Sequence, residues 1–98
     1  MTDRKDILET AIGLTCGDRD KDYGSPVPNM DHIAAMMTAY LGDRLKEPLT
    51  GADAAWFQVL VKASRCKTSP TKRDNYDDAA AYVGIAGECA MMETELRT

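Results

Sequence analysis

The stretch that decides the fold reads VLVKASRCKTSPTKRDNYDDAAAY and runs from Val59 to Tyr82. Its first part continues a helical pattern, the run TSPT at 68–71 breaks that pattern, and an alanine-rich helix follows. A basic pair, Lys62 and Arg65, stands at helical spacing before the break. The stretch therefore predicts two helices joined by a short polar turn, with positive charge close to the turn.

Positive charge is concentrated on both sides of this turn. Five cationic side chains fall within twelve residues, namely Lys62, Arg65, Lys67, Lys72 and Arg73. An arginine offers planar bidentate geometry for phosphate, a lysine adds a point charge, and the N-terminus of the next helix exposes N–H groups. We predict an anion pocket around Lys62 and Arg65. The alternative is structural, because the same two cations can pair with Asp74, Asp77 or Asp78 across the turn, or cover the helix C-terminus.

Aromatic and polar residues supply possible further ligand contacts. Tyr76 and Tyr82 could stack on a base or donate a hydroxyl, although aromatic residues at such positions more often belong to a core. The loop GDRDKDYGSPVPNM at 17–30 is too rich in glycine, proline and charge to form a regular element. Its Arg19, Tyr23 and Asn29 offer hydrogen-bonding and stacking groups, and we include them in the predicted ligand site.

Two helices are expected before this stretch. The first should start near Thr2 or Asp3, with Asp3 as its N-cap, and stop near Gly17. The second should be capped by Asn29 and should bury the apolar positions at helical spacing, which are Ile33, Met36, Met37, Tyr40 and Leu41.

The other two helices flank the turn. Thr50 followed by Asp53 resembles a capping box, which predicts a third helix from Gly51. Its expected buried stripe is Trp56, Val59, Leu60 and Ala63, widened by Phe57 and Val61. The region at 74–75 should cap a fourth helix from about Tyr76 to Glu95, whose many small residues permit close helix packing.

These patterns predict an all-α protein, a compact four-helix arrangement in which residues 1–98 form a single helical domain. At 98 residues the chain lies near the lower limit for a self-sufficient core. We therefore expect a homo-oligomer.

Composition excludes several classes of function. A formal net charge of −4 argues against binding to bulk nucleic acid, which favours a basic face. Cys16, Cys66 and Cys89 are widely separated, as expected of reduced thiols, and the single histidine, His32, excludes a multi-histidine metal site. The sequence shows neither a signal peptide nor a membrane span, so we expect a cytoplasmic protein that does not bind membranes.

Acidic residues suggest an enzymatic alternative. All-α nucleoside triphosphate pyrophosphohydrolases bind magnesium through carboxylates at helical spacing, and Asp74, Asp77 and Glu88 imitate part of that pattern. The facing acidic pairs of such enzymes are missing here. An acidic start of the fourth helix, which favours the helix dipole, explains Asp74 to Asp78 better. Magnesium is thus expected only under this alternative, and otherwise no cofactor is.

Three motifs together resemble a known family. The chain reads D-R-x-x-D-Y-G-S-P-x-x-N-M at 18–30, K-x-x-R at 62–65 and P-x-x-x-D-N-Y-x-D-x-A-x-Y at 70–82. This pattern is similar to that of small phage and prophage proteins carried as a domain of unknown function, with Met30 where Phe is usual and Ala81 where Gly often stands. The resemblance marks the polar positions Arg19, Tyr23, Gly24, Asn29, Lys62, Arg65, Asp74, Tyr76, Asp77 and Tyr82.

The resemblance implies a phage context rather than an activity. Small helical phage proteins are similar in size and style to oligomeric sponges that sequester cyclic nucleotide or ADP-ribose signals of antiviral defence. We predict a non-enzymatic, anti-defence type of protein that sequesters a phosphate-containing nucleotide. The alternatives are the magnesium-dependent enzyme and a helical adaptor that inhibits a host protein through exposed Met-rich and Ala-rich faces.

Overall fold

The fold consists of helices throughout the part of the chain that the structure describes. The computed structural model describes residues 2–17, 21 and 24–97. Within these residues it contains four α-helices, one short 3-10 helix and no strand, which confirms the all-α prediction. The helices are α1 (Arg4–Thr15), α3 (Val27–Leu41), η1 (Gly42–Arg44), α4 (Gly51–Thr68) and α5 (Arg73–Arg97).

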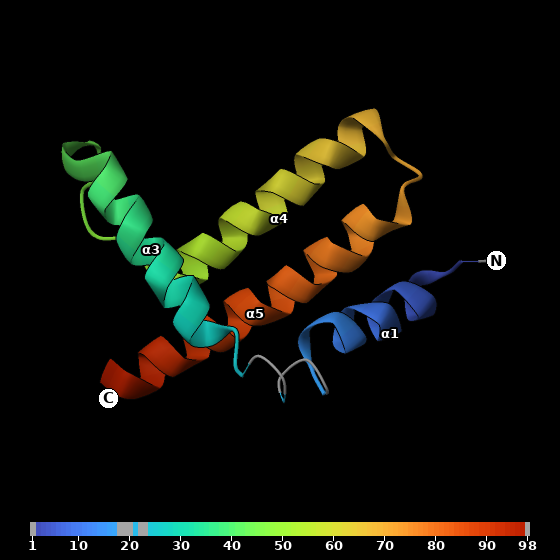
Figure 1. Cartoon of the computed structure of the whole chain (residues 1–98), viewed down its shortest axis with the longest axis horizontal. Coiled ribbons are helices and arrows are strands. Elements are labelled where there is room, and N and C mark those ends of the chain that lie inside the picture. The colour runs from blue at the N-terminus through green and yellow to red at the C-terminus, as the bar shows by residue number, and fades with distance from the viewer. Residues whose placement is uncertain (1, 18–20, 22–23, 98) are drawn as a thin grey trace.

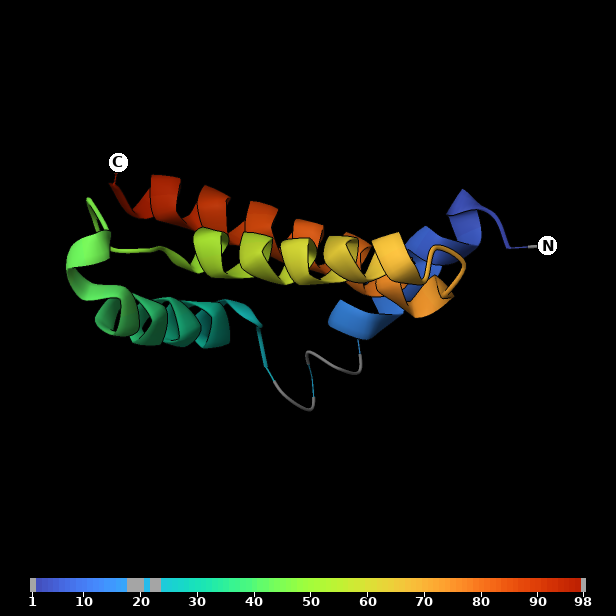
Figure 2. The ribbon, with the colours of Figure 1, turned by 90° about the horizontal axis from the view of Figure 1, so that it is seen from above.

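The helices α4 and α5 form an antiparallel pair that is the centre of the molecule (Figure 1). The helix α1 lies along the other side of the first half of α5, and among the helices that the structure describes it packs only against α5. Figure 2 shows α3 on one side of the α4–α5 pair. The result is elongated, measuring 46 × 32 × 24 Å, and is thus less compact than the sequence predicted.

Two helix starts are fixed by the predicted capping residues. In α1 the Asp3 carboxylate accepts from the N–H of Asp6, and the Asp6 carboxylate accepts from the N–H of Asp3. In α4 Thr50 and Asp53 form the same reciprocal pair. Each box satisfies two N–H groups that a helix end leaves unpaired, so both starts are encoded locally.

The other two predicted helix starts were wrong by a few residues. The helix α3 begins at Val27, and its first free N–H donates to Ser25 Oγ at 3.2 Å, so Asn29 lies inside the first turn instead of capping it. Pro28 is tolerated in the first turn of α3 because the N–H groups of a first turn have no helical acceptor. The helix α5 begins at Arg73, so the predicted cap at 74–75 also lies inside the helix.

The core is built from small side chains. Its buried members are Val27, Met30, Ala34, Ala54, Ala55, Ile85, Ala86 and Cys89. The predicted stripe of α4 was wrong, because Trp56 and Leu60 are half-exposed and the alanines on the opposite face pack inward. On α3 likewise, Met36 and Tyr40 are exposed. Alanine allows α4 and α5 to approach closely near the start of α4.

Three helices meet at the N-terminus of α4. The N–H of Ala52 donates to Glu93 Oε1 of α5 at 3.4 Å, and Asp31 of α3 lies against Gly51. A Cβ at Gly51 would collide with the Asp31 carboxylate and would lie 3.4 Å from its backbone nitrogen. Acidic groups are favoured at this positive end of the helix dipole, so they fix the relative positions of α3, α4 and α5.

Arg73 fastens α1 to α5. Its guanidinium donates to the carbonyl of Asp6 at 3.0 Å and to Thr10 Oγ1 at 2.7 Å. The same side chain pairs with the buried carboxylate of Asp77 at 3.3 Å. One side chain therefore serves both as the counterion of a buried charge and as the main polar link between two helices.

The Arg73→Gln variant should lower the free energy of unfolding by about 2 kcal/mol, since it leaves Asp77 without its counterion and removes the link to α1. Urea unfolding measures the change. Arg44→Gln, at an exposed position, is the control and should cost less than about 0.5 kcal/mol. Equal effects of the two variants would contradict this role of Arg73.

Stability should fall in alkaline solution because of Cys89. Burial, together with the carboxylates of Asp31, Glu93 and Glu88, raises the pKa of this thiol above its usual 9.0. The unfolded chain therefore releases the proton first, so the stabilisation is complete below pH 9 and is lost as the pH rises toward the folded-state pKa. The urea midpoint of the wild type should drop between pH 8.5 and about pH 10.5 more steeply than that of Cys89→Ala.

Candidate functional site

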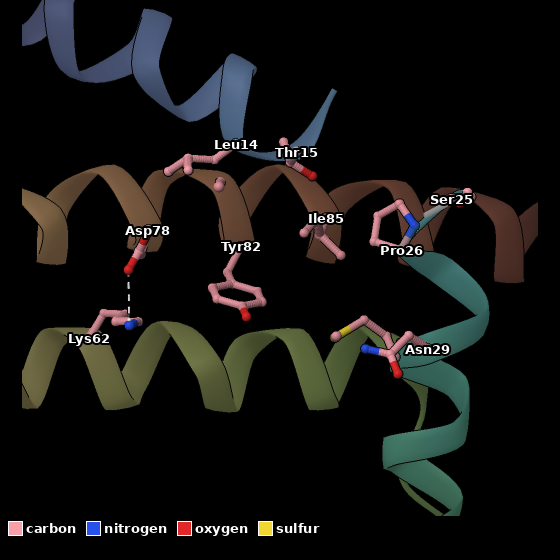
Figure 3. A pocket seen from close by; sticks show the side chains of 12 residues that line it. Leu14, Thr15, Ser25, Pro26, Asn29, Lys62, Asp78, Tyr82 and Ile85 are labelled. Carbon is pink, nitrogen blue, oxygen red and sulfur yellow. Dashed lines mark ion pairs between the residues drawn. The ribbon is translucent and has the colours of Figure 1, made fainter. Parts of the chain in front are cut away.

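A cleft of about 520 Å³ is bordered by all four α-helices (Figure 3). The end of α1, the start of α3 and the facing sides of α4 and α5 form its walls. Its lining residues are Leu14, Thr15, Gly24, Ser25, Pro26, Asn29, Met30, Lys62, Asp78, Ala81, Tyr82 and Ile85. The volume lies in the range that small-molecule sites occupy.

An ion pair closes one end of the cleft. Lys62 Nζ lies 3.0 Å from Asp78 Oδ2, and the two side chains are 17% and 32% exposed. Figure 3 shows them reaching toward each other from α4 and α5. This pairing is one of those expected under the structural alternative for Lys62. An ammonium group has three donors, so the contact with Asp78 leaves donors for a second partner.

Tyr82 and Asn29 stand along the same cleft. The half-buried ring of Tyr82 projects from α5 into the space beside α4, and Asn29 comes from the first turn of α3 (Figure 3). Three of the residues predicted for the ligand site, Asn29, Lys62 and Tyr82, thus line one cavity although they are far apart in the sequence. Met30 and Ile85 give that cavity an apolar floor.

Other predicted site residues lie elsewhere. Arg65 is exposed on α4 and, like Tyr76, does not line the cleft. Arg19 and Tyr23 lie outside the described residues. Gly24, the neighbour of Tyr23, does line the cleft, which places the end of that loop at the site.

Tyr76 holds the turn between α4 and α5. Its hydroxyl donates to the carbonyl of Pro70 at 2.6 Å. Desolvation and the neighbouring Cys66 raise the pKa of this phenol above its usual value of 10.0. The hydrogen bond gives Tyr76 a structural role at the position where a ligand contact was predicted.

The three carboxylates of the magnesium alternative are not brought together. Asp77 is buried in its pair with Arg73, while Asp74 and Glu88 are exposed. Glu88 lies eleven residues after Asp77 on one helix, a rise of about 16 Å. In the part of the chain that the structure describes, no three His, Cys, Asp or Glu residues are placed to share a metal ion.

Sequence reasoning missed the importance of Asp78. The motif D-N-Y-x-D, counted from Asp74, ends at Asp78, whereas Asp77 was taken as the second acidic position. The sequence analysis named Asp78 only as one of three possible partners of Lys62, and counting the motif correctly would have singled it out. The contributions of Leu14, Ser25 and Ile85 to the cleft carry no local signal, because they depend on how the helices pack.

The comparison with protein families agrees with the sequence motifs. Residues 6–90 match the family described as a domain of unknown function, DUF6378. The chain belongs to this family. The predicted resemblance to a phage family of unknown function is thereby confirmed.

Two relatives come from mycobacteriophages. The Gene 55 protein of Mycobacterium phage D29 is 36% identical over 78 residues, which cover 80% of this chain and 49% of that protein. The Gene 55 protein of Mycobacterium phage L5 is 30% identical over 89 residues, covering 91% and 55%. The DUF6378 chain is homologous to both and spans about half the length of each. No solved structure matches it.

The described helices of this DUF6378 protein include none that is both long and apolar enough to cross a membrane.

A double-mutant cycle with Lys62→Met and Asp78→Asn should give a coupling of about 1 kcal/mol in urea unfolding, because the pair is short and largely shielded from solvent. The pair between Lys5 and Glu9, longer at 3.8 Å and mostly exposed, is the control and should couple by less than about 0.5 kcal/mol. Equal couplings would show that the cleft does not strengthen the pair between Lys62 and Asp78.

Proposed function

We propose that the cleft binds a phosphate-containing small molecule, a nucleotide, and holds it without turning it over. The observation that carries the proposal is the convergence of Lys62, Asn29 and Tyr82 on one cavity of nucleotide size. In this arrangement Lys62 holds phosphate, the ring of Tyr82 stacks on the base, and the amide of Asn29 reads a polar edge of the base.

The charge of the cleft selects among nucleotides. Among the described residues that line the cleft, Lys62 is the only cation, and Asp78 already compensates its charge. A triphosphate would bring several negative charges close to the Asp78 carboxylate, whereas a phosphodiester brings one. The site therefore favours a ligand of low charge, such as a cyclic nucleotide, over a nucleoside triphosphate.

The lining groups suit binding better than catalysis. The polar side chains along the cleft are an amide, hydroxyl groups and an ion pair, and the Asp78 carboxylate is engaged by Lys62. General base catalysis needs a free proton acceptor beside the reacting group. Homology to phage proteins supports a role in the cytoplasm of an infected bacterium, where sequestering a nucleotide signal would blunt antiviral defence.

A thermal-shift and calorimetry screen of cyclic and linear nucleotides without magnesium tests the proposal. A selected ligand at about 100 times its Kd should raise the unfolding midpoint by on the order of 10 °C. Lys62→Ala, Tyr82→Ala and Asn29→Ala should each weaken binding about tenfold or more. Lys72→Ala removes an equal charge at an exposed turn position and is the control.

Recovery of the ligand separates binding from turnover. After incubation with an equimolar amount of protein and denaturation, chromatography should return the nucleotide unchanged. A hydrolysed product, or a screen in which no nucleotide shifts the midpoint, would contradict the proposed function.

A further inference from the structure

The helix α4 has two apolar faces, and the chain covers only the one with small side chains. Ala54 and Ala55 are fully buried against the neighbouring helices. On the opposite side Trp56 is 50% and Leu60 60% exposed, and the exposed Phe57 borders this face. Large aromatic and aliphatic residues normally fill cores and interfaces, so this distribution is the reverse of what a monomer needs.

The surface area of the chain points the same way. Its accessible surface is 7255 Å². A folded monomer of this mass exposes about 5,500 Å². The excess is larger than the roughly 800 Å² that each partner buries in a standard interface. The radius of gyration, 14.7 Å, also exceeds the approximately 12.6 Å expected of a compact domain of this length.

The charges along the outer face are arranged with twofold symmetry. Asp53, Leu60 and Lys67 follow each other at intervals of seven residues, so they lie along one line of the helix. All three are exposed. Leu60 is the midpoint, with an acidic residue about 10 Å away toward one end and a basic residue about 10 Å away toward the other.

We propose that this outer face of α4 pairs with the same face of a second copy of the chain. A twofold axis at Leu60 makes the two α4 helices antiparallel and brings Asp53 of each copy opposite Lys67 of the other. Parallel pairing would set like charges against each other. Antiparallel pairing packs Trp56 and Leu60 of both copies around the axis, with the two α4 helices in the middle and α5 of each copy on the outer side.

The dimer leaves the cleft free. Lys62, which lines the cleft, follows Leu60 by two residues and is therefore about 200° around the helix axis from it. The seam through Asp53, Leu60 and Lys67 thus faces away from the cavity. Dimerisation does not depend on the proposed function, and each can be tested while the other fails.

The longer relatives identify the competing occupant of this face. The two Gene 55 proteins are about twice as long as the matched region, so in them an additional segment could lie on α4. For the 98-residue chain, the self-complementary charges favour a second copy. If the face is instead covered by an extra segment in the longer proteins, this chain should stay monomeric. The mass measured in solution distinguishes the two cases.

Sedimentation equilibrium is the first test. The wild type should have twice the chain mass of 10.7 kDa at micromolar concentration. Leu60→Lys should weaken association by about a hundredfold or more, because the change occurs twice at the axis. The matched control is Met36→Lys on α3, since Met36 is 61% exposed and Leu60 60%. A monomeric wild type, or equal effects of the two variants, would overturn the proposal.

The sole tryptophan supplies a second readout. Emission from Trp56 should shift to shorter wavelength as the wild-type concentration rises through the dissociation constant, because dimerisation removes the half-exposed ring from water. Leu60→Lys should keep the long-wavelength emission. Circular dichroism shows whether that variant is folded. A wild-type emission spectrum that does not change with concentration would contradict pairing through this face of α4.

Two further variants test the orientation. Lys67→Glu should weaken the dimer about tenfold by facing Asp53 of the partner, while Lys46→Glu, an equal charge change on an exposed loop, should have no effect. Leu60→Cys, in a Cys16→Ser background, should cross-link under mild oxidation, since the two residues meet at the axis. Efficient dimerisation without this cross-link would exclude the proposed axis.

Discussion

Close contact between α4 and α5 is the constraint on which the rest of the structure depends. Alanines at 54, 55 and 86 and the thiol of Cys89 let the two helices pack with little between them. The helix α3 packs against both α4 and α5, and α1 packs against α5. The cleft forms farther along the pair, where Lys62 and Tyr82 stand between the two helices in place of alanines. The small core also sets the limit of stability, because alanine buries little apolar area.

Some of the helix boundaries that depend on residues close together in the sequence were predicted correctly. The reciprocal pairs at Asp3 and Thr50 involve residues three apart, so they are visible in the sequence and confirmed in the structure. The break at Thr68 is equally local. The start of α3 was misplaced because Asn29 is a good cap by residue type, whereas Ser25 and two prolines define the start in fact.

The core of α4 could not be predicted by the same means. Its sequence is apolar on two faces, and hydrophobicity alone assigns the larger residues, such as Trp56, to the interior. Which face turns inward is decided by the small residues of α5, a property of the helix pair. The candidate site shows a similar division: Lys62 reaches α5, while Arg65, three residues later, is turned about 60° away and stays in solvent.

The attachment of α1 has a consequence for the cleft. Leu14 and Thr15 form one wall, yet the helix that carries them packs, among the described helices, on α5 alone and is linked to it by Arg73. Under the proposed function, occupancy of the cleft and docking of α1 are therefore two linked equilibria: whatever favours one favours the other by the same free energy. A substitution at Arg73, which touches no part of the cavity, would then be among the determinants of ligand affinity.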